Sequence, residues 1–128
     1  MKFSTNQLAI AAYWLVAGKD GRVDGDEVNE GWNALEYIKI LEQNEDDWEM
    51  IKGLYVTGNL HWDEIIGYIS ELPLLTRYYI NQMIVHGVKR TKGKDNRDVD
   101  SWPALEQFCK DVGIVIKAYN IWAKSKIK

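Results

Sequence analysis

Four carboxylates close together in the sequence are the residues best suited to metal chemistry. They are Asp20, Asp24, Asp26 and Glu27. A hard cation such as Ca²⁺ or Mg²⁺ needs several oxygen ligands that converge from one tight turn, and Gly21 can supply such a turn. These four residues are therefore the candidate ligands of a divalent cation, and no other cofactor is suggested by the sequence.

The order of residues around Gly21 resembles the second half of an EF-hand loop, with an apolar Val23 and a closing Glu27. The first half departs from that pattern, because Val16 and Gly18 stand where carboxylates would be needed. Any ion held here would have few protein ligands. The alternative is structural: Asp24 or Asp26 caps the following helix, and the preceding Asp20 forms an Asx-turn.

A second loop repeats the first with one inserted residue, Asp98. Residues 18–25 read GKDGRVDG, and residues 93–101 read GKDNRDVDS. The second, weaker set of candidate metal ligands is Asp95, Asp98 and Asp100. Basic residues balance these carboxylates, and Trp102 stands where the counterpart of Glu27 should be.

The two loops predict an internal duplication. Each loop follows an apolar segment and precedes a segment with a helix cap, so residues 8–40 and 78–112 are expected to form two helix–loop–helix units around a pseudo-two-fold axis. Asp20 should then superpose on Asp95, and Val23 on Val99.

Enzyme chemistry has little support in the remaining residues. His61 and His86 are the only histidines, and neither has the spacing of a metal ligand or of a catalytic triad. The single cysteine, Cys109, lies in an apolar stretch typical of a buried thiol. We therefore expect a protein that is not an enzyme.

The elements that would position these residues are all helical. Spacings of three and four between apolar residues predict seven helices, at about residues 7–17, 26–43, 45–57, 62–72, 73–90, 102–112 and 114–126. The first is apolar nearly all round, which is typical of a central core helix. Ser4 and Gln7 form a capping box before it, and Asn44 caps the third. The fold class is therefore all-α, in a single domain over residues 1–128.

Composition limits the partners. The 128 residues carry a net charge of -3, so the chain lacks the basic footprint of a nucleic-acid-binding protein. The apolar run 8–17 is too short for a membrane span, and polar residues come too early for a signal peptide. We expect a cytoplasmic protein with an unidentified protein partner and no membrane span; neither the partner nor the oligomeric state can be named from the sequence.

One family resemblance can be stated on these residues. The positions Ala17, Asp20, Gly21, Val23 and Glu27 fit the run Ala-x-x-Asp-Gly-x-Ile/Val-x-x-x-Glu of the TerB-like family. The closing segment 105–114 is also similar to the ending of that family's second half. Asn96 in place of glycine and the missing second glutamate depart from the pattern. The resemblance implies an all-α fold of about seven helices, acidic metal sites, and a role in stress or tellurite resistance.

Three functions follow from these observations. The first is a non-enzymatic TerB-like module that acts through protein contacts and binds a divalent cation weakly. The second is a helical protein-interaction domain without a metal, whose acidic loops are turns and caps. The third is a hydrolase that uses loop carboxylates on a metal.

Overall fold

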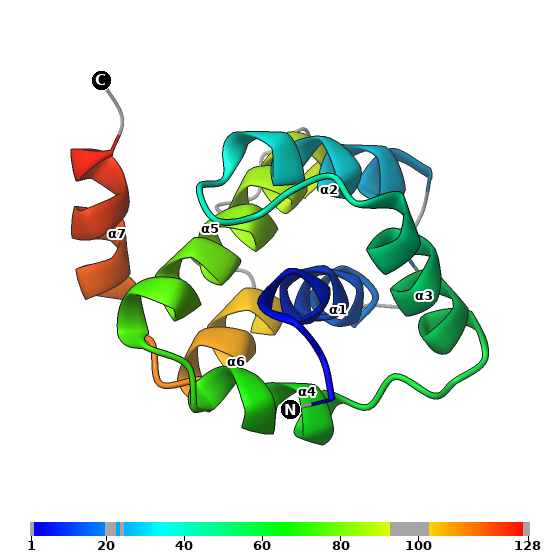
Figure 1. The fold of residues 1–128 in the computed structure, drawn as a ribbon. Helices are drawn as coiled ribbons and strands as arrows, with labels where there is room; N and C mark the ends of the chain where they lie inside the picture. The colour runs from blue at the N-terminus through cyan, green and yellow to red at the C-terminus, as the bar shows by residue number, and fades with distance from the viewer. Residues whose placement is uncertain (1, 20–22, 24, 93–102, 127–128) are drawn as a thin grey trace.

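The computed structural model describes residues 2–19, 23, 25–92 and 103–126 (Figure 1). It contains seven helices: α1 (Thr5–Ala17), α2 (Gly25–Tyr37), α3 (Glu45–Val56), α4 (Trp62–Ser70), α5 (Leu74–Lys92), α6 (Pro103–Asp111) and α7 (Ile116–Ser125). The described residues contain no strand. For these residues, the predicted all-α class and the number of helices are confirmed.

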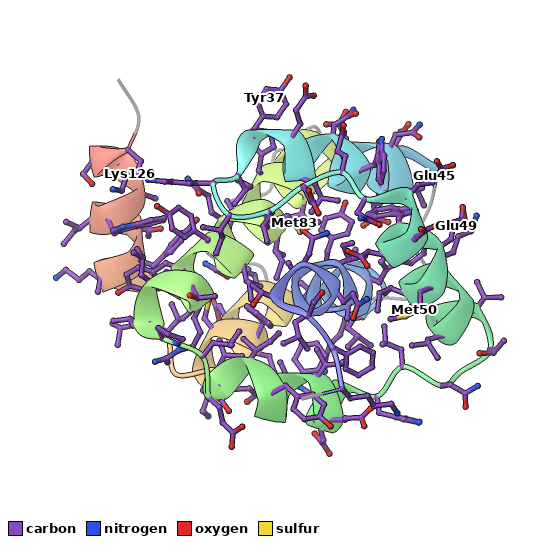
Figure 2. All side chains as sticks on the ribbon, viewed as in Figure 1. Tyr37, Glu45, Glu49, Met50, Met83 and Lys126 are labelled. Atoms are coloured by element: carbon purple, nitrogen blue, oxygen red, sulfur yellow. The ribbon has the colours of Figure 1, made fainter. Side chains whose placement is uncertain are left out.

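Helix α1 is the centre of the molecule. It packs against α2, α3, α4, α5 and α6, and Figure 1 shows it nearly end-on with these helices around it. Nine of its residues are buried, as its apolar composition predicted. The capping box is also confirmed, because the Gln7 amide donates to Ser4 Oγ and the Ser4 amide donates to Gln7 Oε1. Met83 of α5 lies inside the same core (Figure 2).

A tyrosine from α1 is held between two glycines of the neighbouring helices. A Cβ on Gly31 of α2 would lie 2.3 Å from Tyr13 Cε2, and one on Gly87 of α5 would lie 2.5 Å from Tyr13 Cε1. The Tyr13 hydroxyl donates a hydrogen bond to the backbone carbonyl of Glu27. The absence of side chains at both glycines therefore allows α2 and α5 to close on the ring.

The second helix is shorter than the sequence predicted. It ends at Tyr37, whereas the apolar spacing indicated a helix to about residue 43. Ile40 adopts a φ of +73°, a conformation that cannot continue a right-handed helix. The apolar pattern was misleading because Ile38 and Leu41 are buried all the same, from the turn that follows the helix.

The last helix stands at one side of the molecule (Figure 1). Its aromatic residues Tyr119 and Trp122 pack against Tyr78 and Tyr79 of α5, with ring centroids 5.1–5.7 Å apart. This aromatic cluster holds α7 against the N-terminal part of α5.

The predicted duplication is tested only in part. Both halves contain a helix, a loop and a second helix: α1 with α2, and α5 with α6. Helix α2 packs on α5 and α6 packs on α1, but the first of these interfaces is much the more extensive, so the packing does not establish a two-fold axis. Asp95 and Val99, however, lie outside the described residues, so the superposition of the loops remains a prediction.

Candidate functional site

The first acidic loop enters α2 through two carboxylates that face different ways. Asp26 is exposed, whereas Glu27 is 1% exposed and belongs to the buried interior. Neighbouring residues of a helix point about 100° apart, which accounts for the exposure of one carboxylate and the burial of the other. Asp20 and Asp24, the other predicted ligands of this site, lie outside the described residues.

The second predicted set of metal ligands also lies outside the described residues. This set consists of Asp95, Asp98 and Asp100 of the second loop. Among the residues that are described, no group of three His, Cys, Asp or Glu side chains could hold an ion. Val23, by contrast, is half-buried and packs against the core, as its apolar character predicted.

The histidines and the cysteine occupy structural positions. His61 is the N-cap residue of α4, without a capping hydrogen bond from its side chain. His86 packs its ring against Tyr37, with centroids 5.4 Å apart. The buried Cys109 Sγ lies 3.3 Å from Asn81 Oδ1, and burial raises the pKa of the thiol to about 12. A thiol of that pKa is not a nucleophile at neutral pH.

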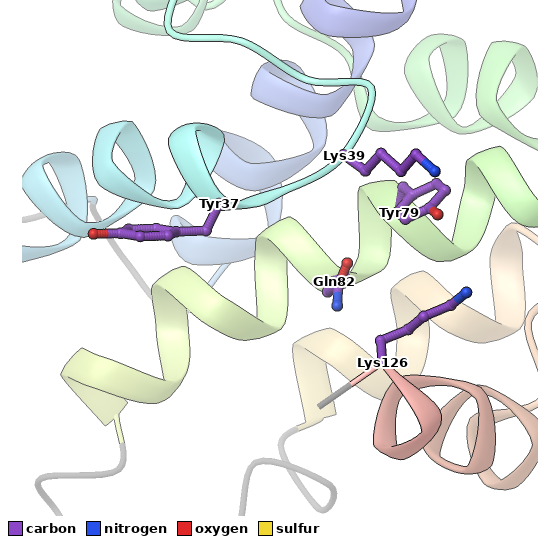
Figure 3. A pocket seen from close by; sticks show the side chains of 5 residues that line it. All are labelled: Tyr37, Lys39, Tyr79, Gln82 and Lys126. Atoms are coloured by element: carbon purple, nitrogen blue, oxygen red, sulfur yellow. The ribbon is translucent and has the colours of Figure 1, made fainter. Parts of the chain in front are cut away.

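A groove that the sequence did not indicate lies between α5, α7 and the end of α2. We call it the lysine groove; its volume is about 250 Å³, and it is lined by Tyr37, Lys39, Tyr79, Gln82 and Lys126. In Figure 3, Lys39 approaches from the segment after α2 and Lys126 from the end of α7, with Tyr79 and Gln82 of α5 between them. Residues 79 and 82 are three apart and therefore share one face of α5.

The lysine groove is basic although the whole chain is acidic. In the described part of the chain, neither Lys39 nor Lys126 is paired with a carboxylate. Lys126 also lies over the Trp122 ring, 5.6 Å from its centroid, so part of its position is fixed by the aromatic cluster. Two ammonium groups at the edges of one groove create a local positive potential that favours an anionic ligand.

One exposed apolar side chain, Tyr37, lines the lysine groove; it is 65% exposed and projects from the molecule (Figure 2). A second, Ile40, follows Lys39 in the sequence and is 52% exposed. Sequence reasoning missed this surface for two reasons. The residues were assigned to a continuous helix, and no local pattern in the sequence brings Lys126 near Lys39.

None of the described helices is long and apolar enough to cross a bilayer.

Comparisons of the chain with models of protein families, with characterised proteins and with solved structures gave no match.

Proposed function

We propose that this protein is a non-enzymatic interaction module that binds a protein partner at the turn after α2. The observation that carries the proposal is Ile40. A branched, apolar side chain is exposed there on a backbone with φ of +73°, which costs stability and contributes little to the core. A residue that weakens the fold while presenting apolar surface is typical of a binding site.

Residues close to the turn after α2 also favour a binding site there. Tyr37 is among the residue types enriched in the energetic centre of protein interfaces. Its ring is oriented by His86, so little conformational entropy is lost when a partner covers it. Tyr37 is therefore a candidate apolar anchor within the lysine groove, three positions before the exposed Ile40.

The TerB-like resemblance adds a physiological context, stress or tellurite resistance, to this proposal. Its support is the short motif from Ala17 to Glu27 and the seven-helix fold that the resemblance implies. The same resemblance implies a divalent cation at the first loop. The divergence of Asp26 and Glu27 favours the alternative, in which the loop carboxylates serve as turns and caps, and we place protein contacts ahead of cation binding.

Photo-cross-linking in the source cells tests the proposed function. A photoreactive p-benzoylphenylalanine replaces Ile40 in one variant and Val56 in a control. Val56 is 71% exposed on α3, across the molecule from α7 (Figure 1). A discrete protein adduct from position 40 that position 56 does not give is the expected result. The same adducts from both positions, or none, would contradict the proposal.

A further inference from the structure

We infer that the lysine groove binds an acidic peptide segment of the partner, with an apolar residue of that segment resting on Tyr37 and Ile40. This inference rests on the proposed function and names the chemistry of the partner. The groove joins two features that a peptide of this kind needs: a pair of cations, Lys39 and Lys126, and the exposed ring of Tyr37.

The charge of the groove selects acidic side chains. Lys39 and Lys126 belong to different elements, yet both line the same groove. Each is without a carboxylate partner in the described residues, although acidic residues outnumber basic ones by 19 to 16 in the chain. Charge complementarity of this type guides encounter with acidic partners and disfavours basic ones.

The shape of the groove favours a peptide over a small anion. An inorganic anion is held best by donors that converge on one point, whereas Lys39 and Lys126 stand on either side of Tyr79 and Gln82 (Figure 3). The Gln82 amide can both donate to and accept from a peptide backbone. The exposed Tyr37 that lines the groove would have no role with an inorganic ion.

The test is a titration of the full chain followed by backbone amide NMR shifts. The probe is Ac-Glu-Glu-Leu-Glu-Glu-NH₂, compared with Ac-Gln-Gln-Leu-Gln-Gln-NH₂ and with inorganic phosphate. We expect shifts from the acidic peptide at Lys39, Ile40, Gln82 and Lys126, and much smaller shifts from the other two probes.

Charge reversal supplies the matched comparison. Lys39→Glu with Lys126→Glu should weaken binding of the acidic peptide about tenfold or more, because two attractive charges become repulsive. Lys52→Glu with Lys110→Glu makes the same change in net charge at exposed positions on α3 and α6, and should leave the affinity within about twofold. Lys39→Gln with Lys126→Gln repeats the test without repulsion, and a thermal melt of each variant verifies folding.

Four results would overturn the inference: equal binding of the glutamine peptide, equal weakening by both charge-reversal pairs, shifts from phosphate alone, or self-association of the chain in place of peptide binding. If position 40 cross-links a protein but the acidic peptide fails to bind, the interaction module stands and only the acidic nature of its partner is wrong.

Discussion

Among the described residues, Glu27 best distinguishes the two interpretations of the first loop, as a structural turn or as a metal site. Its carboxylate is buried in the first turn of α2, where the helix dipole favours a negative charge. Its own backbone carbonyl accepts the hydrogen bond from Tyr13. The residue therefore links the first turn of α2 to the core through its backbone, while its side chain is buried.

We expect Glu27→Gln to lower the free energy of unfolding by about 1 kcal/mol, since it removes the charge but keeps the shape. The exposed Asp26→Asn, in the same helical turn, should cost only a few tenths of that and is the control. Thermal melts of both variants and of the wild type, each with and without excess calcium, measure the effect. A calcium-dependent rise in the melting temperature of the wild type, lost in Glu27→Gln, would instead establish the cation site.

Cys109 gives a second prediction at the scale of a residue. Because burial raises the pKa of its thiol to about 12, the thiolate is scarce at pH 8 in the folded protein. Reaction with 5,5′-dithiobis(2-nitrobenzoate) should be slow in buffer and complete on adding guanidinium chloride. Rapid reaction of the folded chain would show that the thiol is accessible, against the packing described for α6.

The packing of α2 on α5 depends on two glycines, Gly31 and Gly87. Gly31→Ala should lower the free energy of unfolding by about 3 kcal/mol, because its Cβ collides with the buried Tyr13 ring, which has no room to move. Gly53→Ala in α3 is the control: no atom lies within 4 Å of its added Cβ, and it should gain about 0.5–1 kcal/mol of stability. Urea denaturation of both variants decides, and equal stabilities would contradict the close approach.

In the turn after α2, a substitution should raise stability instead of lowering it. Ile40→Gly relieves a left-handed backbone at a branched residue and should raise the free energy of unfolding by about 1 kcal/mol. Gly58→Ala, at a φ of +75° with open space around the added Cβ, should lower it by about the same amount. Loss of stability in Ile40→Gly would mean that the Ile40 side chain is part of the core and would remove the main argument for a binding site.

Most of the helices could be predicted from the sequence, because the residues that determine a helix lie close together in the chain. The capping residues of α1 and α3, and the all-round apolar character of α1, depend on neighbours within a few positions. The end of α2 could not be predicted, because the buried Ile38 and Leu41 continue the helical spacing through a turn. The lysine groove was also beyond prediction, because it depends on where the aromatic cluster places α7.

At the scale of the whole molecule, a central helix supports the helices that carry the proposed binding face. Helix α1 is enclosed by five other helices, and the aromatic cluster attaches α7 at one side. The central helix fixes α2 and α5 through Tyr13, and these two helices in turn carry one wall and the floor of the lysine groove. Tyr37, Tyr79 and Gln82 of the proposed binding face are therefore carried by a closely packed helix pair, whereas the position of Lys126 depends on the aromatic cluster that attaches α7.

Mapping the site of cross-linking on the partner tests the central claim most directly. With p-benzoylphenylalanine in place of Ile40, mass spectrometry of the adduct identifies the partner residue that lies against the turn after α2. The account predicts one adduct site, within or next to an acidic segment, and loss of that adduct when Lys39→Glu and Lys126→Glu are added. Adduct sites scattered over several proteins, or an adduct unaffected by the two charge reversals, would contradict it.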